Sequence, residues 1–269
     1  MEWREKAGEI LARIRAARPL VHHITNLVVT NLTANTTLAV GASPVMAHAP
    51  EEVREMVRLA RCLVLNIGTL TPALVESMIA AGQEANRIGV PVVLDPVGAG
   101  ATGLRTSSAA RILAEVKVDV LRGNAAEVAI VGGYEAAVKG VEAAAGPENP
   151  AEVTRRIAER LGTVVAATGP VDYVSDGRRT LEVHNGHPLL TAVTGTGCMA
   201  TAVIGAFRAV EEDRVLAAAA ALAYFGYAAE LAAARAEGPG SFQVHLLDAL
   251  YRLQPDELVR GARIGEVAA

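Results

Sequence analysis

Cysteine and the aromatic residues are scarce in this chain of 269 residues: there are two cysteines, and aromatics make up 3%. Two cysteines cannot form a disulfide framework and fit a reducing compartment, so we expect a cytoplasmic protein. Because 51% of the residues are hydrophobic, we expect a sizeable core built from Ala, Val, Leu and Ile. A chain of this length can hold one large or two small domains, and we expect one domain spanning 1–269.

Strong charge and membrane signals are also missing. The chain has 25 basic and 29 acidic residues, well mixed, with a formal charge of −4, which indicates neither a nucleic-acid surface nor a polybasic membrane surface. The first residues, MEWREKAGEILARIRAARP, are spaced as an amphipathic helix and contain no apolar signal-peptide core. The longest uncharged run, 215–229, is too short and too rich in alanine to span a bilayer. We therefore expect a buried core helix there, in a soluble protein without nucleic-acid or membrane partners.

Short apolar runs alternate with helical patterns along most of the chain. The apolar runs lie at 20–24, 63–67, 90–94, 118–121 and 164–167, and the helical patterns at 50–59, 72–87, 106–116 and 150–161. Continuous apolar strands between helices predict an α/β fold with a mostly parallel sheet covered by helices on both faces. Two further runs, 173–175 and 179–183, flank Asp176-Gly177 and predict a hairpin. From 196 to 251 we expect almost only helix, interrupted by G-P-G-S at 238–241.

Polar residues follow four of the predicted strands. They occur in the segments L-V-L-N-I-G-T, V-V-L-D-P-V-G-A-G, D-V-L-R-G-N-A-A-E and T-V-V-A-A-T-G-P, and comprise Asn66, Thr69, Asp95, Arg122, Asn124, Glu127, Thr168 and Gly169. In open parallel sheets ligands bind at the carboxyl ends of strands. We therefore expect these residues to line one crevice.

Two familiar phosphate-binding glycine turns do not fit the chain. A Walker A loop needs lysine followed by Ser or Thr, and Lys6, Lys117 and Lys139 are followed by Ala, Val and Gly. The stretch 98–103 matches G-x-G-x-x-G, but Asp95-Pro96 intervenes and no acidic residue ends the next strand, so dinucleotide binding is not favoured. The turn T-G-T-G-C at 194–198 opens a helix instead, and the free N–H groups of Gly195, Thr196 and Gly197 predict an anion hole.

Several candidate residues allow a structural alternative. Asp95 fits magnesium chemistry or a simple D-P turn. Asn124 and Glu127 fit a hard-cation site or an N-cap with a first-turn acid; with Asp95 nearby the two readings are even. Arg122 ends a buried strand and needs an anion, either a ligand or a structural partner. The Asn- and Thr-rich run 24–37 predicts a helix-like segment whose polar face is buried or solvated.

The two cysteines differ in context. Cys62 lies in an apolar run and is expected to be a buried structural thiol. Cys198 stands at a helix N-terminus, where its pKa should fall, although it also fits a small packing residue or the group that meets an acceptor hydroxyl. His22, His23 and His48 form no ligand pattern with the cysteines, which argues against zinc.

The motifs resemble those of ribokinase-like kinases. G-T-G-C at 195–198 resembles their G-A-G-D anion-hole motif with Cys in place of Asp, and R-G-N-A-A-E at 122–127 resembles their N-x-x-E magnesium motif. The motifs H-H-I-T-N, S-P-V-M-A-H-A-P-E-E, N-I-G-T-L, L-D-P-V-G-A-G-A-T, A-A-T-G-P-V-D-Y-V and G-P-G-S-F extend the match from about residue 19 to about 252. Over this span the chain resembles the hydroxyethylthiazole kinases of thiamin salvage, in which Cys for Asp is typical.

The resemblance implies a single-domain ribokinase-like fold and transfer of the γ-phosphoryl group of ATP, with Mg²⁺, to the hydroxyl of 4-methyl-5-(2-hydroxyethyl)thiazole. It also implies a homotrimer with sites at subunit interfaces. Carried onto this chain, it assigns thiazole contacts to Asn26, Met46 and Gly195, the first two from a neighbouring subunit; ATP contacts to Arg122 and Thr168; and Mg²⁺ to Asp95 and Glu127 with help from Asn124. Cys198 would orient the hydroxyl and contribute modestly to catalysis.

Three other functions fit parts of the sequence. One is an ATP- or ADP-dependent dehydratase of nicotinamide nucleotide hydrates on the same fold, although such proteins usually keep Asp at the position of Cys198. The second is a covalent cysteine hydrolase or acyl-transfer enzyme, which needs a base near Cys198. The third is a nucleotide-binding regulator without catalysis.

Overall fold

The computed structural model describes residues 2–134 and 149–267. Lys139, which entered the Walker A comparison, lies outside the described residues, as do the ends of the predicted 1–269 domain. The described strands form one nine-stranded sheet in the order β2-β1-β3-β4-β5-β6-β7-β8-β9. They are β1 (Leu20–Ile24), β2 (Ser43–Val45), β3 (Cys62–Asn66), β4 (Val92–Asp95), β5 (Val120–Asn124), β6 (Val164–Thr168), β7 (Asp172–Ser175), β8 (Thr180–Val183) and β9 (Ile264–Glu266).

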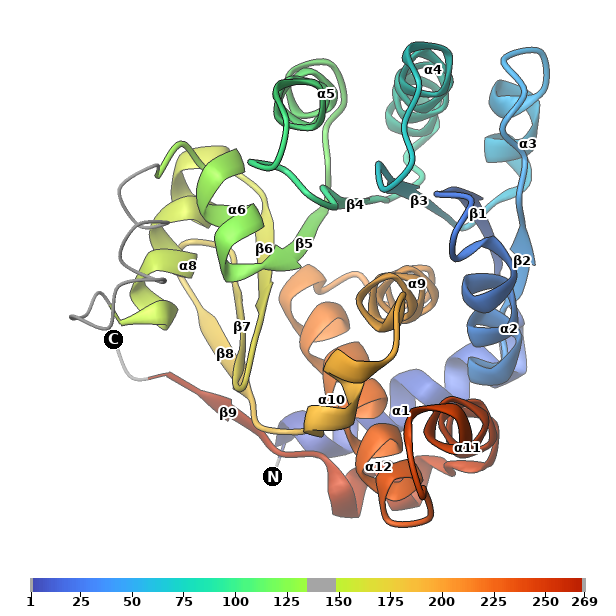
Figure 1. The fold of residues 1–269 in the computed structure, drawn as a ribbon, viewed down its shortest axis with the longest axis vertical. Coiled ribbons are helices and arrows are strands. Elements are labelled where there is room, and N and C mark those ends of the chain that lie inside the picture. The colour runs from blue at the N-terminus through green and yellow to red at the C-terminus, as the bar shows by residue number, and fades with distance from the viewer. Residues whose placement is uncertain (1, 135–148, 268–269) are drawn as a thin grey trace.

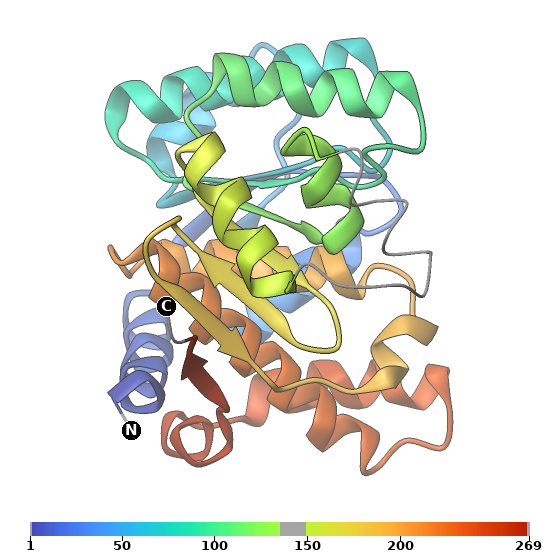
Figure 2. The same cartoon turned by 90° about the vertical axis from the view of Figure 1, so that its left-hand side faces the viewer.

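The strands from β2 to β6 pair in parallel, and the pairs β6–β7, β7–β8 and β8–β9 are antiparallel. In the parallel part Asn66 pairs with Asp95 and Asn124 pairs with Thr168. The carboxyl ends of these strands therefore lie at one edge of the sheet. The predicted hairpin is present as β7 and β8, and Figure 2 shows helix α8 (Pro150–Leu161) lying against it.

Helices cover both faces of the sheet, which confirms the predicted α/β class. Figure 1 shows α3, α4 and α5 on one side of β1, β3 and β4, with α9 and α10 on the other. The remaining described helices are α1, α2, α6, α11 and α12, and a short 3₁₀ turn precedes α9. Their bounds are α1 (Glu2–Ala17), α2 (Thr30–Val40), α3 (Val53–Leu59), α4 (Pro72–Ile88), α5 (Gly103–Glu115), α6 (Ala125–Val131), α9 (Thr196–Arg208), α10 (Arg214–Ala233), α11 (Pro239–Arg252), α12 (Pro255–Gly261) and the 3₁₀ turn η1 (Pro188–Ala192).

Successive side chains of each buried strand point to opposite faces of the sheet and pack into two separate hydrophobic cores. In β3, Cys62 and Val64 pack toward α1, α9 and α10, whereas Leu63 and Leu65 pack toward α3, α4 and α5. Cys62 is fully buried, as predicted for a structural thiol. Helix α10 is the one helix in the described residues that is long and apolar enough to cross a membrane, and 83% of its most apolar window is buried inside the protein. The prediction of a buried core helix at 215–229 is confirmed.

Two expectations about helices need refinement. The helical region from 196 to 251 is broken twice, after α9 and after α10, and α11 begins at Pro239 because proline suits the first position of a helix. The polar face of α2 is partly buried: Thr33, Thr36 and Thr37 are buried and donate to carbonyls of their own helix. The buried alternative therefore holds for these threonines, inside this chain.

Candidate active site

Polar side chains from four neighbouring strands meet where those strands end. Asn66 Nδ2 donates to Asp95 Oδ2 over 3.1 Å. Arg122 Nη1 lies 3.7 Å from the same oxygen, and Arg122 Nη2 donates to Thr168 Oγ1 over 2.7 Å. Because parallel pairing places the ends of β3, β4, β5 and β6 side by side, these four side chains meet, as the sequence predicted.

The glycine turn brings a helix N-terminus to the same place. Gly195 precedes α9 with φ +85°, and a Cβ there would lie 2.6 Å from Val29 Cγ1, so both the backbone angle and the space require glycine. A Cβ at Gly197 would lie 2.7 Å from Arg122 Nη1. The guanidinium therefore lies against the first turn of α9, whose N–H groups have no helical partner. A cation beside free N–H groups is an arrangement that binds phosphate.

The Thr196 side chain takes no direct part in this arrangement. Its hydroxyl donates to Leu190 O over 2.7 Å, which fixes the turn before α9. Only its backbone N–H remains available for an anion, as the anion-hole prediction requires. Arg122 Nε is buried without a protein partner, which is further unused hydrogen-bonding capacity at this edge.

Asp95 is fully buried and only half of its carboxylate is satisfied. Oδ2 accepts hydrogen bonds from Thr201 Oγ1 at 2.7 Å and from Asn66 Nδ2 at 3.1 Å, whereas Oδ1 is buried without a partner. Burial raises the pKa of Asp95 to about 6, against the opposing effect of Arg122. A buried oxygen left without a donor is the kind of ligand that a hard cation requires.

Asn124 and Glu127 form a reciprocal capping box at the start of α6. Glu127 N donates to Asn124 Oδ1 and Asn124 N donates to Glu127 Oε2, both over 2.9 Å. Gly98 N donates to Glu127 Oε1 over 2.8 Å. The structural alternative weighed for this pair is thus present, although each carboxylate oxygen keeps a second lone pair. Within residues 2–134 and 149–267 no group of three or more His, Cys, Asp or Glu side chains is placed to hold a metal.

The predicted pKa of Cys198 is wrong in direction. Burial, and then the neighbouring Asp95 carboxylate, raise the pKa of the thiol to about 11, and together they outweigh the lowering effects of Asn66, Arg122 and Asn26. Asn66 Nδ2 and Asn26 Nδ2 donate to Sγ over 3.2 and 3.6 Å. An amide cannot serve as a base, so these contacts give no support to the cysteine hydrolase alternative.

Asn66 is the centre of the polar network, a role that sequence reasoning missed. Its Oδ1 accepts from Asn26 Nδ2 at 2.8 Å and from Gly68 N at 2.9 Å, while its Nδ2 donates to Asp95 and Cys198. All four hydrogen-bonding positions of the amide are therefore used. Its place at the end of an apolar run was the signal in the sequence.

Thr201 and Asp172 were also missed. Thr201 lies on α9 one turn after Gly197, and its spacing from the glycine turn could have indicated a shared face. Asp172 accepts from Gly169 N over 2.9 Å, and burial raises the pKa of Asp172 to about 6. Asp172 thereby holds the turn that follows Thr168.

The residues predicted to contact the thiazole differ in how deeply they are buried. Asn26 is buried, and its amide donates to Asn66 and Cys198 of its own chain; the implied supply of Asn26 and Met46 by a neighbouring subunit stays a prediction. Met46 is half-buried directly after the edge strand β2. Leu27 and Val28, beside Asn26, are 81% and 66% exposed.

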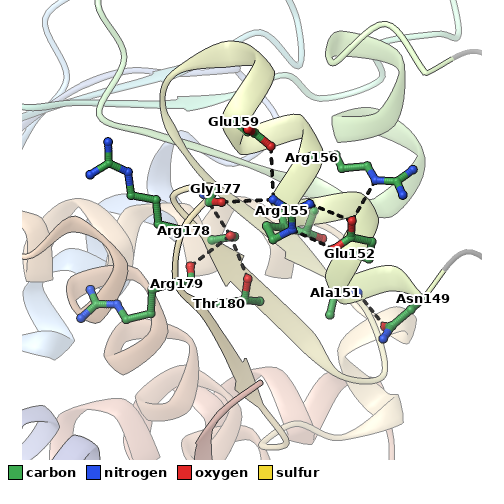
Figure 3. Close-up of polar contacts among 12 residues, drawn as sticks. Asn149, Ala151, Glu152, Arg155, Arg156, Glu159, Gly177, Arg178, Arg179 and Thr180 are labelled. Carbon is green, nitrogen blue, oxygen red and sulfur yellow. Dashed lines mark hydrogen bonds and ion pairs between the residues drawn. The ribbon is translucent and has the colours of Figure 1, made fainter. Parts of the chain in front are cut away.

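Two hollows in the described surface lie away from this edge. One, of about 580 Å³, is lined by residues of α1 and the start of α10. The other, of about 610 Å³, lies between α8 and β8. There Arg155 and Arg156 both pair with Glu152 (Figure 3). None of the site residues predicted from the sequence lines either hollow.

Comparison with known proteins gives a consistent result over nearly the whole chain. The sequence model of the hydroxyethylthiazole kinase family matches residues 11–256. The hydroxyethylthiazole kinase of Moorella thermoacetica is 60% identical over 264 residues, which cover 98% of this chain and 99% of that protein. The solved structure of the Pyrococcus horikoshii hydroxyethylthiazole kinase superposes with a TM-score of 0.90 at 50% identity, covering 97% of this chain and 99% of the other.

A more distant structure agrees in fold alone. A ribokinase-like superfamily protein of Enterococcus faecalis superposes with a TM-score of 0.65 at 12% identity, covering 92% of this chain and 95% of the other. The ribokinase-like architecture implied by the motifs is thus confirmed.

Proposed function

The chain belongs to the hydroxyethylthiazole kinase family, and from that premise we propose that it transfers the γ-phosphoryl group of ATP to the hydroxyl of 4-methyl-5-(2-hydroxyethyl)thiazole in thiamine biosynthesis. The observation in the structure that carries this proposal is the Arg122 guanidinium against the first turn of α9. The dehydratase alternative is not favoured, because the family match goes to the kinase and position 198 is cysteine.

On the ATP side we assign Arg122 and Thr168. Phosphoryl transfer depends on positioning and on stabilising the charge of the transferred group. Arg122 supplies a fixed cation, and the N–H groups of Gly195, Thr196 and Gly197 supply oriented dipoles. Thr168 accepts from Arg122 and donates to Gly123 O over 3.2 Å, so it holds the guanidinium at the strand end.

For Mg²⁺ we assign Asp95 and Glu127, with Asn124 assisting. The unpartnered Oδ1 of Asp95 supports this assignment, and the charge of Glu127 is close enough to raise the pKa of Asp95. When bound, Mg²⁺ would neutralise charge on the phosphate oxygens. Thr201 and Asn66 hold the other carboxylate oxygen and thereby direct Oδ1 away from themselves.

For the acceptor alcohol we assign Asn26, Met46 and Gly195, with Cys198 next to the hydroxyl. With its pKa raised to about 11 the thiol stays protonated at neutral pH, so it is a poor general base there. A loose transition state needs little help from a base. We therefore infer that Cys198 orients the hydroxyl rather than removing its proton.

We also propose a cytoplasmic homotrimer with sites at subunit interfaces. Exposed apolar side chains support it: Leu27 and Val28 directly follow Asn26 and are largely exposed, and Leu38 of α2 and Val244 of α11 are 52% and 60% exposed on two helices that pack together. A second chain would cover such side chains. One sheet passes through the described residues, which supports a single domain over 1–269.

The deciding experiment measures ADP release by the purified protein with Mg·ATP, with and without the thiazole alcohol. We expect thiazole-dependent ADP release, a phosphorylated thiazole by mass spectrometry and a trimeric mass by light scattering. ATP binding without any stimulation by the thiazole would contradict the proposal and favour the dehydratase or the regulator.

A further inference from the structure

Three histidines are packed beside the predicted thiazole contacts, and the phosphoryl-transfer chemistry uses none of them. His22 and His23 are fully buried on β1, and His48 is half-buried after β2. Each Nε2 has a protein partner, whereas the Nδ1 atoms of His22 and His23 are buried without one. His22 Nε2 is 2.7 Å from Ala47 O, His23 Nε2 is 3.1 Å from Thr37 Oγ1, and Thr25 N lies 3.1 Å from His48 Nε2.

The backbone partners fix which nitrogen carries the proton in two of these rings. A carbonyl can only accept, so His22 Nε2 carries a hydrogen and donates it to Ala47 O. A backbone N–H can only donate, so His48 Nε2 must be a bare acceptor for Thr25 N. His48 is therefore neutral in this structure, with its proton on Nδ1.

Together these two bonds hold Ala47 and His48, in the segment that follows β2, against β1 and the residue after it. The edge strand β2 has three residues, and its register with β1 ends at the His22–Val45 pair. Beyond that pair, His22 holds Ala47 and Thr25 holds His48. Met46 directly precedes Ala47, and Asn26 directly follows Thr25. The two bonds consequently set the separation between the residues assigned to the thiazole.

We propose that His48 is a positioning residue for the acceptor alcohol: its neutral Nε2, bound to Thr25 N–H, holds the Met46 segment against the Asn26 turn. The proposal rests on the proposed function, because the roles of Asn26 and Met46 come from it. It concerns the alcohol alone, since Arg122 and Thr168 lie across the sheet on β5 and β6. Loss of the bond should weaken thiazole binding and leave ATP binding unchanged.

The same bond makes thiazole binding sensitive to acid. A proton added to Nε2 would face the Thr25 N–H, and two donors cannot bond. The charged and titratable groups facing His48 are Glu52, before α3, and His22 and His23 on β1. Burial lowers the pKa of His48 and Glu52 opposes this, with burial dominant. The bond is therefore intact at neutral pH and is lost as the pH falls.

The test compares His48→Leu with His48→Gln, whose side-chain oxygen can take the place of Nε2 as acceptor. We expect His48→Leu to raise the thiazole KM about tenfold, the effect of one lost hydrogen bond, with the ATP KM unchanged. His48→Gln should restore the thiazole KM to within about threefold of the native value. As a control, His184→Leu removes an exposed histidine that follows β8, at the opposite end of the sheet from β1 and β2. It should change neither the thiazole KM nor the ATP KM.

A pH series supplies a readout that a merely structural role would not move. The thiazole KM of the native enzyme should rise as the pH is lowered below neutrality, and that of His48→Gln should change less. An equal rise in both enzymes would overturn the proposal, as would a His48→Leu variant that raises the two KM values together. These outcomes need native turnover. If the native enzyme fails to phosphorylate the thiazole, the proposed function itself is wrong, and the positioning role is wrong with it.

Discussion

Two carboxylates, Asp95 and Glu152, show how differently this molecule treats the same chemical group. Asp95 is fully buried at the carboxyl end of β4. One of its oxygens has no hydrogen-bond partner, and burial raises its pKa to about 6. Glu152 stands on the surface of α8, where Arg155 and Arg156 donate to it (Figure 3) and lower its pKa to about 2. Ionised Asp95 therefore lowers the stability of the folded chain, whereas the charge of Glu152 is compensated by the neighbouring arginines.

This difference in environment indicates which of the two carboxylates serves function and which affects only stability. A buried carboxylate with one unsatisfied oxygen destabilises the folded chain unless a ligand completes it. Such a group is therefore a candidate for catalysis or metal binding. A solvated ion-pair cluster contributes little to either. Changing each group in turn should produce effects of very different size.

The largest effect is expected from Asp95→Asn. The amide oxygen can still accept from Thr201, so the fold is kept, but the negative charge at the phosphate site is lost. We expect kcat to fall about 100- to 1,000-fold. Because the buried charge is removed, the free energy of unfolding at pH 7 should stay the same or rise by about 1 kcal/mol. Steady-state kinetics and denaturant unfolding test both halves. Retained turnover would remove Asp95 from the site, and a collapse of stability would make its role structural.

Arg122→Ala should have the next largest effect. The guanidinium is the cation that stands against Gly197 and bonds Thr168, so kcat/KM for ATP should fall about 100-fold. Thiazole binding, assigned to Asn26, Met46 and Gly195, should be unchanged, because the polar contacts of the Arg122 side chain go to Asp95 and Thr168. Separate titrations of the two ligands by calorimetry distinguish the two. Equal weakening of both would indicate that Arg122 supports the whole crevice rather than the nucleotide.

A smaller effect is expected from Cys198→Ala. The thiol is protonated at neutral pH and is held by two amides, so its removal should lower kcat about tenfold without abolishing it. Correspondingly, the native rate should show no dependence on a thiol ionising below about pH 10. Turnover at background level would instead make the thiol essential. Full retention would make it a bystander.

The sequence predicts which side chains at the strand ends come together, but not their electrostatics. Asn66, Asp95 and Arg122 could be located because each follows an apolar run, and parallel pairing brings such strand ends together. The pKa of Cys198 could not be predicted, since the helix N-terminus is visible in the sequence whereas burial and the approach of Asp95 are tertiary. Thr201 was missed for the same reason. Its spacing from the glycine turn could have placed it on the same helix face, but the contact of its hydroxyl with Asp95 arises from packing.

The smallest effect is expected from Glu152→Gln, which tests the surface carboxylate that was compared with Asp95. Glu152 is on the surface and far from β4, so kcat and both KM values should be unchanged. Removing one carboxylate from a solvated cluster should lower Tm by only about 1–3 °C at low salt, and by less in high salt.

The pH dependence of that small change has a definite sign. The folded-state pKa of Glu152, about 2, lies below its ordinary value of 4.5, so its stabilisation is present above pH 4.5 and is lost as the pH falls toward 2. The Tm difference between native enzyme and variant should therefore shrink over that range in a melting series. A difference that persists at low pH would mean that Glu152 acts through packing rather than charge, and the contrast with Asp95 would no longer be electrostatic.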